Sequence, residues 1–180
     1  VSNAPTNGYF LSAQSGNTGG LTWAAASGGG GSLELISTNT FTSAASSLDF
    51  TSISGYIYYK LFFALVTSNA GVLYIRVGID GTYDTGSNYR LGGGSVNQVQ
   101  LLGGFSAKAY CGETTITHLN QSLSTKINST GVTESNDANS IGDFQTGGGH
   151  STLAAQNCLK VYGASGDIPS GTISLYGVKI

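Results

Sequence analysis

Hydrophobic and polar positions alternate most clearly between Ile53 and Arg90, and this stretch predicts the centre of the fold. Tyr56–Val66 is dominated by aromatic and aliphatic residues and carries only Lys60 as a charge, so we expect this strand to be core rather than surface. Val72–Asp80 alternates strictly, as a half-buried strand does. The SNAG sequence at Ser68–Gly71 tolerates positive φ and predicts that the two strands form a hairpin. The apolar face of the second strand comprises Leu73, Ile75, Val77 and Ile79.

Other apolar runs follow one another at short intervals from Leu33 onwards, separated by Gly, Asn and Ser. This regular spacing predicts a β-sandwich or a barrel, and no window combines helical periodicity with an N-cap. Pro5 and Pro169 lie outside every expected strand, which keeps the backbone donors of the sheets intact. With the central pair, about nine strands are expected, the others being Leu33–Phe41, Leu48–Ile53, Val96–Phe105, Thr114–Leu119, Leu123–Asn128, Leu153–Tyr162 and Thr172–Ile180.

Two long polar stretches, Gly81–Ser95 and Ser129–Ser151, interrupt this pattern. Gly, Asn, Asp and Thr dominate both, so we expect them to be surface loops. Because binding residues are often carried by loops, any ligand is expected to bind there.

The first 32 residues differ from the rest of the chain. Two small apolar clusters, Tyr9–Leu11 and Leu21–Trp23, lie among Gly, Ser and Asn and are followed by a flexible tetrad at Gly28–Gly31. A hairpin of this size buries too little apolar surface to be stable alone. We therefore predict an N-terminal arm over residues 1–32, anchored by Leu11 and Trp23 on the body or on another subunit, and a β-sandwich body over residues 33–180.

Composition and charge narrow the possible functions. Only 9% of the residues are charged, against about 25% in a typical soluble protein. The seven Lys and Arg residues are scattered and the net charge is −2, so no nucleic-acid partner is expected. The longest apolar run contains Lys60 and is too short to span a bilayer, and we expect no membrane insertion. The chain contains no Met, so Val1 is expected to follow a removed Met or a longer removed segment.

Candidate catalytic and metal-binding residues are few. His118 and His150 come without a GxSxG motif, and a glycosidase-type pair such as Asp84 with Asp143 would have to be assembled from distant loops. The DGTYDTG sequence at Asp80–Gly86 spaces oxygen ligands like a calcium loop but lacks the closing bidentate acid, which favours a turn. We expect neither an enzyme nor a bound metal or cofactor.

Cys111 and Cys158 have a spacing that matches no metal motif and no CxxC motif. Two buried thiols and a disulfide closing the long intervening segment are both compatible with the sequence.

Three aromatic residues, Tyr83, Tyr89 and Phe144, fall in the expected loops. They are candidates for stacking on the sugar rings of host surface glycans, and the alternative is that they cap one end of the sandwich.

Several stretches, taken in order, resemble a group of bacteriophage virion proteins. The segment NGYFLSAQSGNTGGLTW resembles the start of phage fibre modules, with Tyr9 where Gln is usual. LDFTSI followed by a Tyr-rich strand, LYIRVGIDGTYDTGSNYR and the closing SGTISLYGVKI are similar to later segments of the same group. Residues 92–157 match only in general character. The matching residues of the first segment are Gly8, Leu11, Ser12, Gly16, Gly20 and Trp23.

This resemblance implies a jelly-roll-like body, a trimeric assembly and a non-enzymatic role as a fibre, spike or capsid decoration. It implies location in the virion, after assembly in the host cytoplasm, with other virion proteins as partners. It transfers no catalytic residue. The alternative expectation is a carbohydrate-binding module for host recognition, and a polysaccharide depolymerase is the third.

Overall fold

The chain consists of two compact units, the arm (residues 1–32) and the body (residues 33–180). The computed structural model describes residues 4, 7, 9–16, 18–25, 32–43, 45–66, 72–101, 107–135, 141–163, 168 and 170–179.

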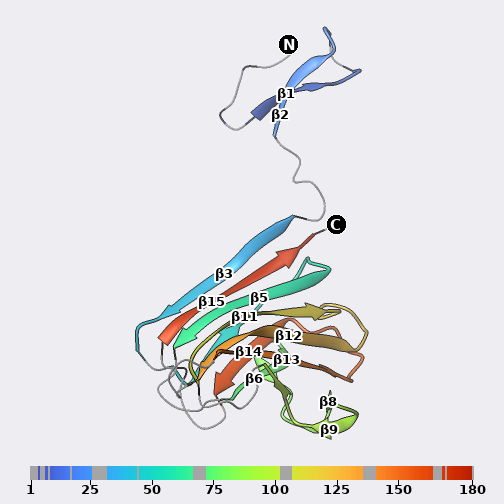
Figure 1. Ribbon diagram of the computed structural model, residues 1–180. Coiled ribbons are helices and arrows are strands. Elements are labelled where there is room, and N and C mark those ends of the chain that lie inside the picture. Colours follow the sequence, from blue (N-terminus) through green and yellow to red (C-terminus); the bar gives the residue numbers. More distant parts are fainter. Residues whose placement is uncertain are drawn as a thin grey trace. The chain divides into compact units, whose positions relative to one another are not determined.

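The arm contains an antiparallel hairpin of β1 (Tyr9–Ala13) and β2 (Leu21–Ala25), as the sequence predicts (Figure 1). Leu11 lies directly opposite Trp23 in this hairpin. The Gln14 N–H donates a hydrogen bond to the Gly20 carbonyl at 2.8 Å and extends the pairing by one step. The glycine tetrad at Gly28–Gly31 lies outside the described residues.

The body contains a large antiparallel sheet of eight strands. Long strands at its centre, such as β11 and β12, are paired over most of their length. In spatial order the strands are β3 (Leu33–Phe41), β15 (Ser170–Val178), β5 (Tyr58–Val66), β11 (Ala107–Thr117), β12 (Thr125–Ser135), β13 (Ile141–His150), β8 (Tyr89–Leu91) and β9 (Gly94–Val96).

A smaller antiparallel sheet of five strands forms the second layer of the body. Its main path is β10 (Val99–Gln100), β6 (Leu73–Ile79), β14 (Cys158–Gly163) and β4 (Ser47–Phe50), with β7 (Thr82–Tyr83) paired to β6. The described residues contain no helix.

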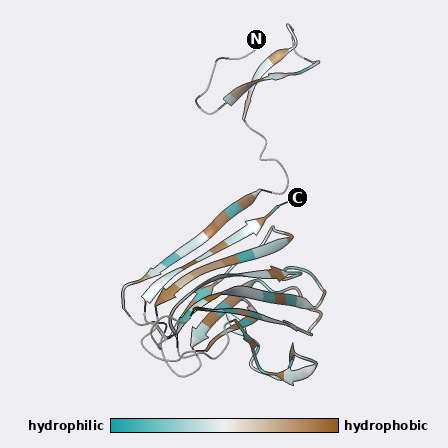
Figure 2. Cartoon of the chain, viewed as in Figure 1, coloured by the Kyte–Doolittle hydropathy of each residue, from teal (hydrophilic) through white to brown (hydrophobic). Residues whose placement is uncertain are grey.

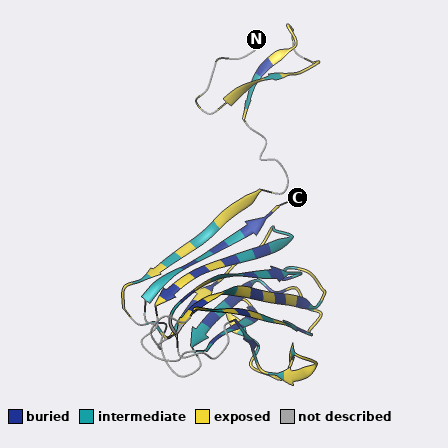
Figure 3. Ribbon diagram, in the orientation of Figure 1, coloured by how far each residue is buried: buried dark blue, intermediate teal, exposed yellow. Residues whose placement is uncertain are grey.

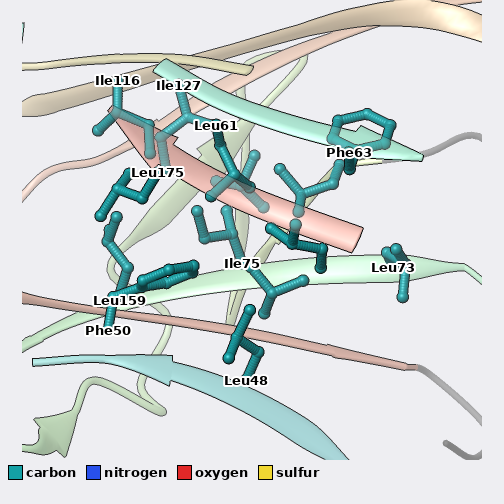
Figure 4. Close-up of a cluster of buried hydrophobic side chains, with 14 of the residues drawn as sticks. Leu48, Phe50, Leu61, Phe63, Leu73, Ile75, Ile116, Ile127, Leu159 and Leu175 are labelled. Atoms are coloured by element: carbon teal, nitrogen blue, oxygen red, sulfur yellow. The ribbon is translucent and has the colours of Figure 1, made fainter. Parts of the chain in front are cut away.

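The core lies between the two sheets, where apolar side chains from both layers meet. Leu61, Ile116 and Leu175 from the large sheet point toward Ile75 and Leu159 of the small sheet (Figure 4). Apolar and polar residues alternate along the strands, so that one face of each sheet packs inward (Figure 2). The all-β, antiparallel sandwich is thus confirmed, whereas the jelly-roll connectivity stays a prediction.

The hairpin predicted from Tyr56–Val66 and Val72–Asp80 is wrong. β5 pairs with β15 and β11 in the large sheet, while β6 pairs with β14, β10 and β7 in the small one. The two strands face each other across the core, and the SNAG segment between them lies outside the described residues. Both arrangements bury the same alternating side chains, so the hydrophobic pattern could not distinguish them.

The prediction that the whole of β5 is core is also wrong. Burial alternates along the strand, as the bands of the large sheet in Figure 3 show. Tyr59, Leu61, Phe63 and Leu65 face the core, whereas Phe62 and Val66 are exposed on the outer face of the sheet. In β6, Leu73, Ile75 and Val77 are buried as expected, but Ile79 is exposed.

The expected loop at Ser129–Ser151 is largely strand, since it contains the end of β12 and all of β13. Glycines take inward positions here because neighbouring groups lie too close for a side chain. Gly112 and Gly131 are direct partners on β11 and β12, and the rings of Phe63 and Phe144 stack with their centroids 6.3 Å apart. A Cβ built on either glycine would meet one of these rings within 3.0 Å. The aromatic rings therefore occupy the volume that side chains on the two central strands would need.

The first and last strands of the body are neighbours in the large sheet. β3 has the bounds expected from the sequence, Leu33–Phe41, and forms one edge of the sheet beside β15. Leu33 at the start of β3 lies opposite Val178 at the end of β15.

Candidate functional site

Two of the three aromatic residues proposed to stack on sugars belong to the core. Tyr89 and Phe144 are both buried, so the prediction that they are exposed loop residues is wrong. The Tyr89 hydroxyl accepts a hydrogen bond from the Val77 N–H at 3.0 Å and lies 3.1 Å from the Asp84 carbonyl, which it can donate to. Burial raises the pKa of this phenol, which keeps it a hydrogen-bond donor.

Tyr83 is partly exposed and is held in place by its neighbours. The Lys160 ammonium lies 4.7 Å from the centre of its ring, and its hydroxyl donates to the Leu159 carbonyl at 3.5 Å. Of the three candidate aromatics, Tyr83 alone has a side chain accessible to a ligand.

The DGTYDTG segment begins with a turn at Asp80 and Gly81, as its Asp and Gly content favours, and continues into β7. Asp80 and Gly81 both have positive φ, 49° and 82°, and connect β6 to β7 in a tight hairpin. Asn157 fixes this turn because its amide donates to Asp80 Oδ1 and its Oδ1 accepts from the Asp80 N–H, both at 2.8 Å.

Asp84, the second acid of this segment, accepts three hydrogen bonds. The Gly86 N–H donates to Oδ1 at 2.7 Å, and Asn88 Nδ2 donates to Oδ2 at 2.7 Å. The third partner is His150 at the end of β13, whose Nε2 lies 2.6 Å from Oδ2. The His150 side chain is 2% exposed and that of Asp84 is 24% exposed, so the carboxylate lies between the interior and the surface.

A buried chain of hydrogen bonds continues inward from His150. Gln156 Nε2 lies 2.6 Å from His150 Nδ1, and Thr125 Oγ1 donates to Gln156 Oε1 at 2.9 Å. The Gln156 amide must therefore donate to Nδ1, which leaves the proton of a neutral imidazole on Nε2, directed at Asp84. We define these four residues, Asp84, His150, Gln156 and Thr125, as the Asp84 chain.

The Asp84 chain orients a carboxylate, and both ring nitrogens of its histidine are engaged in this arrangement. The lone pair of His150 Nδ1 is occupied by Gln156, and Nε2 carries its proton toward Asp84, so the imidazole has no free site for a substrate proton. Asp143, the other acid of the suggested glycosidase pair, is exposed on the outer face of β13, whereas His150 faces inward. The fold thus places Asp84 beside His150, and Asp143 lies on the opposite face of the large sheet. Asp84 and Asp143 therefore do not form the suggested pair of acids.

The Asp84 chain predicts a loss of stability in acid. Partial burial raises the pKa of Asp84, but hydrogen bonds from Asn88, His150 and Gly86 lower it more, so that the pKa falls below its usual value. A group with a depressed folded pKa stabilises the protein above its unfolded pKa of about 4, and this stabilisation is lost as the pH falls through the folded value. Asp84→Asn should cost roughly 1–2 kcal/mol at pH 7 and progressively less below about pH 4.

Urea unfolding at a series of pH values measures this effect as the difference between the wild type and Asp84→Asn. Asp143→Asn, which removes an exposed carboxylate, is the matched control and should keep the wild-type profile. A difference for Asp84→Asn that stays constant down to pH 2 would contradict the prediction.

A second polar cluster surrounds Asn120, next to the Asp84 chain. Asn120 Nδ2 donates to the carbonyls of Ile53 and Gln156, both at 2.7 Å, and its Oδ1 accepts a hydrogen bond from the Tyr59 hydroxyl. Burial raises the pKa of Tyr59 to about 12, so this donor stays protonated over the physiological range. Asn120 thereby joins three segments that are distant in the sequence.

Cys111 and Cys158 are both free thiols, so the disulfide alternative is wrong. Cys158 is buried in the small sheet, whereas Cys111 is exposed on the large one, which corrects the expectation of two buried thiols. Burial raises the pKa of the Cys158 thiol and lowers its reactivity.

Within the described residues, no group of three or more His, Cys, Asp or Glu side chains is placed to hold a metal ion. The same residues include no helix long and apolar enough to cross a membrane.

The sequence did not identify the Asp84 chain or the role of Asn120. The members of the Asp84 chain come from three segments, which contain Asp84, Thr125 and the His150–Gln156 stretch, and only the fold brings these segments together. The sequence contains only weak signals of the Asp84 chain, namely His150 at the end of GGGH and Asp84 at the start of DTG.

A scan against models of known protein families finds no match for this chain, and a search of curated proteins finds none either. The resemblance to bacteriophage virion proteins therefore stays a prediction.

Proposed function

We propose that this chain is a non-enzymatic structural protein of a bacteriophage virion, a fibre, spike or capsid decoration anchored by its N-terminal arm and assembled as a trimer. The phage assignment and the number three rest on the sequence resemblance described above. The observation that carries the anchoring role is the apolar face of the arm.

One face of the arm hairpin is entirely apolar. Direct partners share a face of a hairpin and side chains alternate along each strand, so six residues of β1 and β2 lie together. Leu11 is 44% exposed on this face, and residues 1–32 contain no Asp, Glu, Lys, Arg or His. A small hairpin with an exposed apolar face is expected to be covered by a partner, and an uncharged groove fits it best. The six residues are Tyr9, Leu11, Ala13, Leu21, Trp23 and Ala25.

Exposed apolar residues on the outer face of the large sheet support the proposal that the body self-associates. Val66 is 56% exposed and Ile141 78% exposed, and they line a depression of about 610 Å³ together with Cys111 and Val132. Phe62 adds a further exposed apolar side chain to the same face of β5. Such a face is typical of a surface that another subunit covers, and a closed ring also protects edge strands such as β3.

Binding to virus particles that lack this protein tests the anchoring role. Deleting residues 1–32 should leave the body folded, as judged by circular dichroism, and abolish co-sedimentation with the particles. Leu11→Asp should weaken co-sedimentation by about a hundredfold, because docking would bury an unpaired carboxylate at a cost of about 3 kcal/mol. Sedimentation equilibrium of the full chain should give the mass of a trimer.

Ser12→Asp is the matched control, since it adds the same charge to the other face of the same strand. It should co-sediment like the wild type. Equal losses for Leu11→Asp and Ser12→Asp would contradict docking through the apolar face, and unfolding of the truncated body would show that the arm is part of the sandwich.

A further inference from the structure

A small pocket opens beside the Asp84 chain on the body. Its volume is about 260 Å³, and residues from the β6–β7 hairpin and from the segment after β13 form its walls. Ile79 and Ala154 give it an apolar side, Thr82 and Thr152 supply hydroxyl groups, and Asp84 supplies a carboxylate.

The carboxylate in this pocket is fixed in place from behind. His150 and Gln156 also line the pocket and are buried, and their hydrogen bonds to one another, to Thr125 and to Asp84 allow little movement. An acid that reaches the surface does not need such support for stability alone, because its exposed oxygen can bond to water. Rigid support of a polar group at a cavity is typical of binding sites.

Asp84 keeps capacity to accept a further hydrogen bond. Oδ2 already accepts two hydrogen bonds, from Asn88 and His150, whereas Oδ1 accepts one, from the Gly86 N–H. A carboxylate offers about four acceptor positions, so one on Oδ1 remains for a ligand. The lowered pKa of Asp84 keeps this acceptor ionised at neutral pH.

The chemistry of the walls selects the class of ligand. Among the described residues, no Lys or Arg lines the pocket, so an anion has no counter-charge from them. Asp84 is the single acid among the described lining residues, and a divalent cation, which takes six or more oxygen ligands, would lack most of them. A sugar ring fits, because it combines hydroxyl donors for a carboxylate with C–H groups for an apolar wall.

We propose that this pocket binds a sugar residue of a glycan, with a ring hydroxyl donating to Asp84 Oδ1, the hydroxyls of Thr82 and Thr152 completing the polar contacts, and Ile79 and Ala154 packing against the ring. Tyr83, the partly exposed aromatic candidate, lies in the wall of the same pocket. The proposal goes beyond the structural role and does not depend on it, since a body detached from any particle would keep the pocket.

Titration of the ¹⁵N-labelled full chain with methyl glycosides, followed by amide chemical shifts, tests the proposal. The panel comprises the methyl glycosides of glucose, galactose, mannose, rhamnose, N-acetylglucosamine and N-acetylgalactosamine. At least one should shift the amides of Thr82–Asp84 and Thr152–Ala154, with a dissociation constant on the order of 1 mM. Thr152→Trp should raise this constant at least tenfold by filling the pocket.

Thr130→Trp places the same side chain on the exposed outer face of β12 and should leave binding unchanged. If Thr152→Trp does not fold, Thr82→Trp fills the pocket from β7. The proposal is overturned if no glycoside shifts these amides at about 50 mM, far above a millimolar constant. It is also overturned if the pocket-filling variant binds like the wild type, or if calcium chloride or methylamine alone produces the same shifts.

Discussion

Gly131→Val is expected to destabilise the body by about 3 kcal/mol or more, because no space exists for a side chain between β11 and β12. A Cβ at this position would lie 2.3 Å from the Cys111 carbonyl oxygen and 2.7 Å from the ring of Phe144. The carbonyl belongs to the paired backbone of the large sheet, so relief of the clash requires strands to separate. The ring could move only by giving up its stacking on Phe63.

Urea unfolding followed by circular dichroism and tyrosine fluorescence measures this loss. The chain's single tryptophan, Trp23, belongs to the arm, so the tyrosines are the fluorophores that belong to the body and report on its unfolding. Gly147→Val is the matched control, because the nearest atom to its Cβ, Asn128 Oδ1, is 3.5 Å away and the position is exposed. It should change stability by no more than about 0.5 kcal/mol. Equal unfolding midpoints for the two variants would mean that the glycine pair does not limit the strand spacing.

Asn120→Ala is expected to cost about 3 kcal/mol or more. The substitution leaves the carbonyls of Ile53 and Gln156 without their amide donor and the buried Tyr59 hydroxyl without its acceptor. Each unsatisfied buried group costs about 1–3 kcal/mol, and alanine is too small to restore any of these bonds. Asn128→Ala, at an exposed position of β12, is the matched control and should be nearly neutral.

A double-mutant cycle separates the role of the phenol from that of the amide. Tyr59→Phe alone should cost roughly 1 kcal/mol, and in the Asn120→Ala background it should cost less, because the shared hydrogen bond is already lost. Strictly additive losses would show that the Tyr59–Asn120 bond contributes nothing to stability.

Local patterns in the sequence predicted the elements with ordinary strand composition. The bounds of β3 and the presence of a hairpin in the arm followed from short apolar runs between turn residues, although both arm strands extend two residues beyond the predicted clusters. β13 was missed because three of its five inward positions are Gly142, Thr146 and Gly148, which read as a loop. The close packing that requires a small residue is visible only in the fold, where a Cβ at Gly148 would lie 2.5 Å from the Arg90 carbonyl oxygen of β8. Glycine content alone does not separate a flexible segment from a closely packed one.

Local sequence patterns could not predict the pairing of strands or the assembly of the Asp84 chain, because both depend on contacts between distant segments. The alternation of apolar and polar residues predicts which face of a strand is buried, but it does not predict which strand lies beside it. The predicted pairing of β5 with β6 was wrong for this reason. Asp84 and His150 are 66 residues apart in the sequence, and their contact exists only because β6, β13 and the segment before β14 converge.

The pairing of Leu33 with Val178 bears on how the body can be connected to other sequences. Because the first and last strands of the body begin and end at the same corner of the large sheet, the body is a unit whose two ends leave side by side. It could be inserted into a surface loop of another protein, or its ends joined by a short linker and new termini opened at the β6–β7 turn, without unpairing any strand of the large sheet. A displayed peptide fused after β15 would emerge next to the strand that follows the arm.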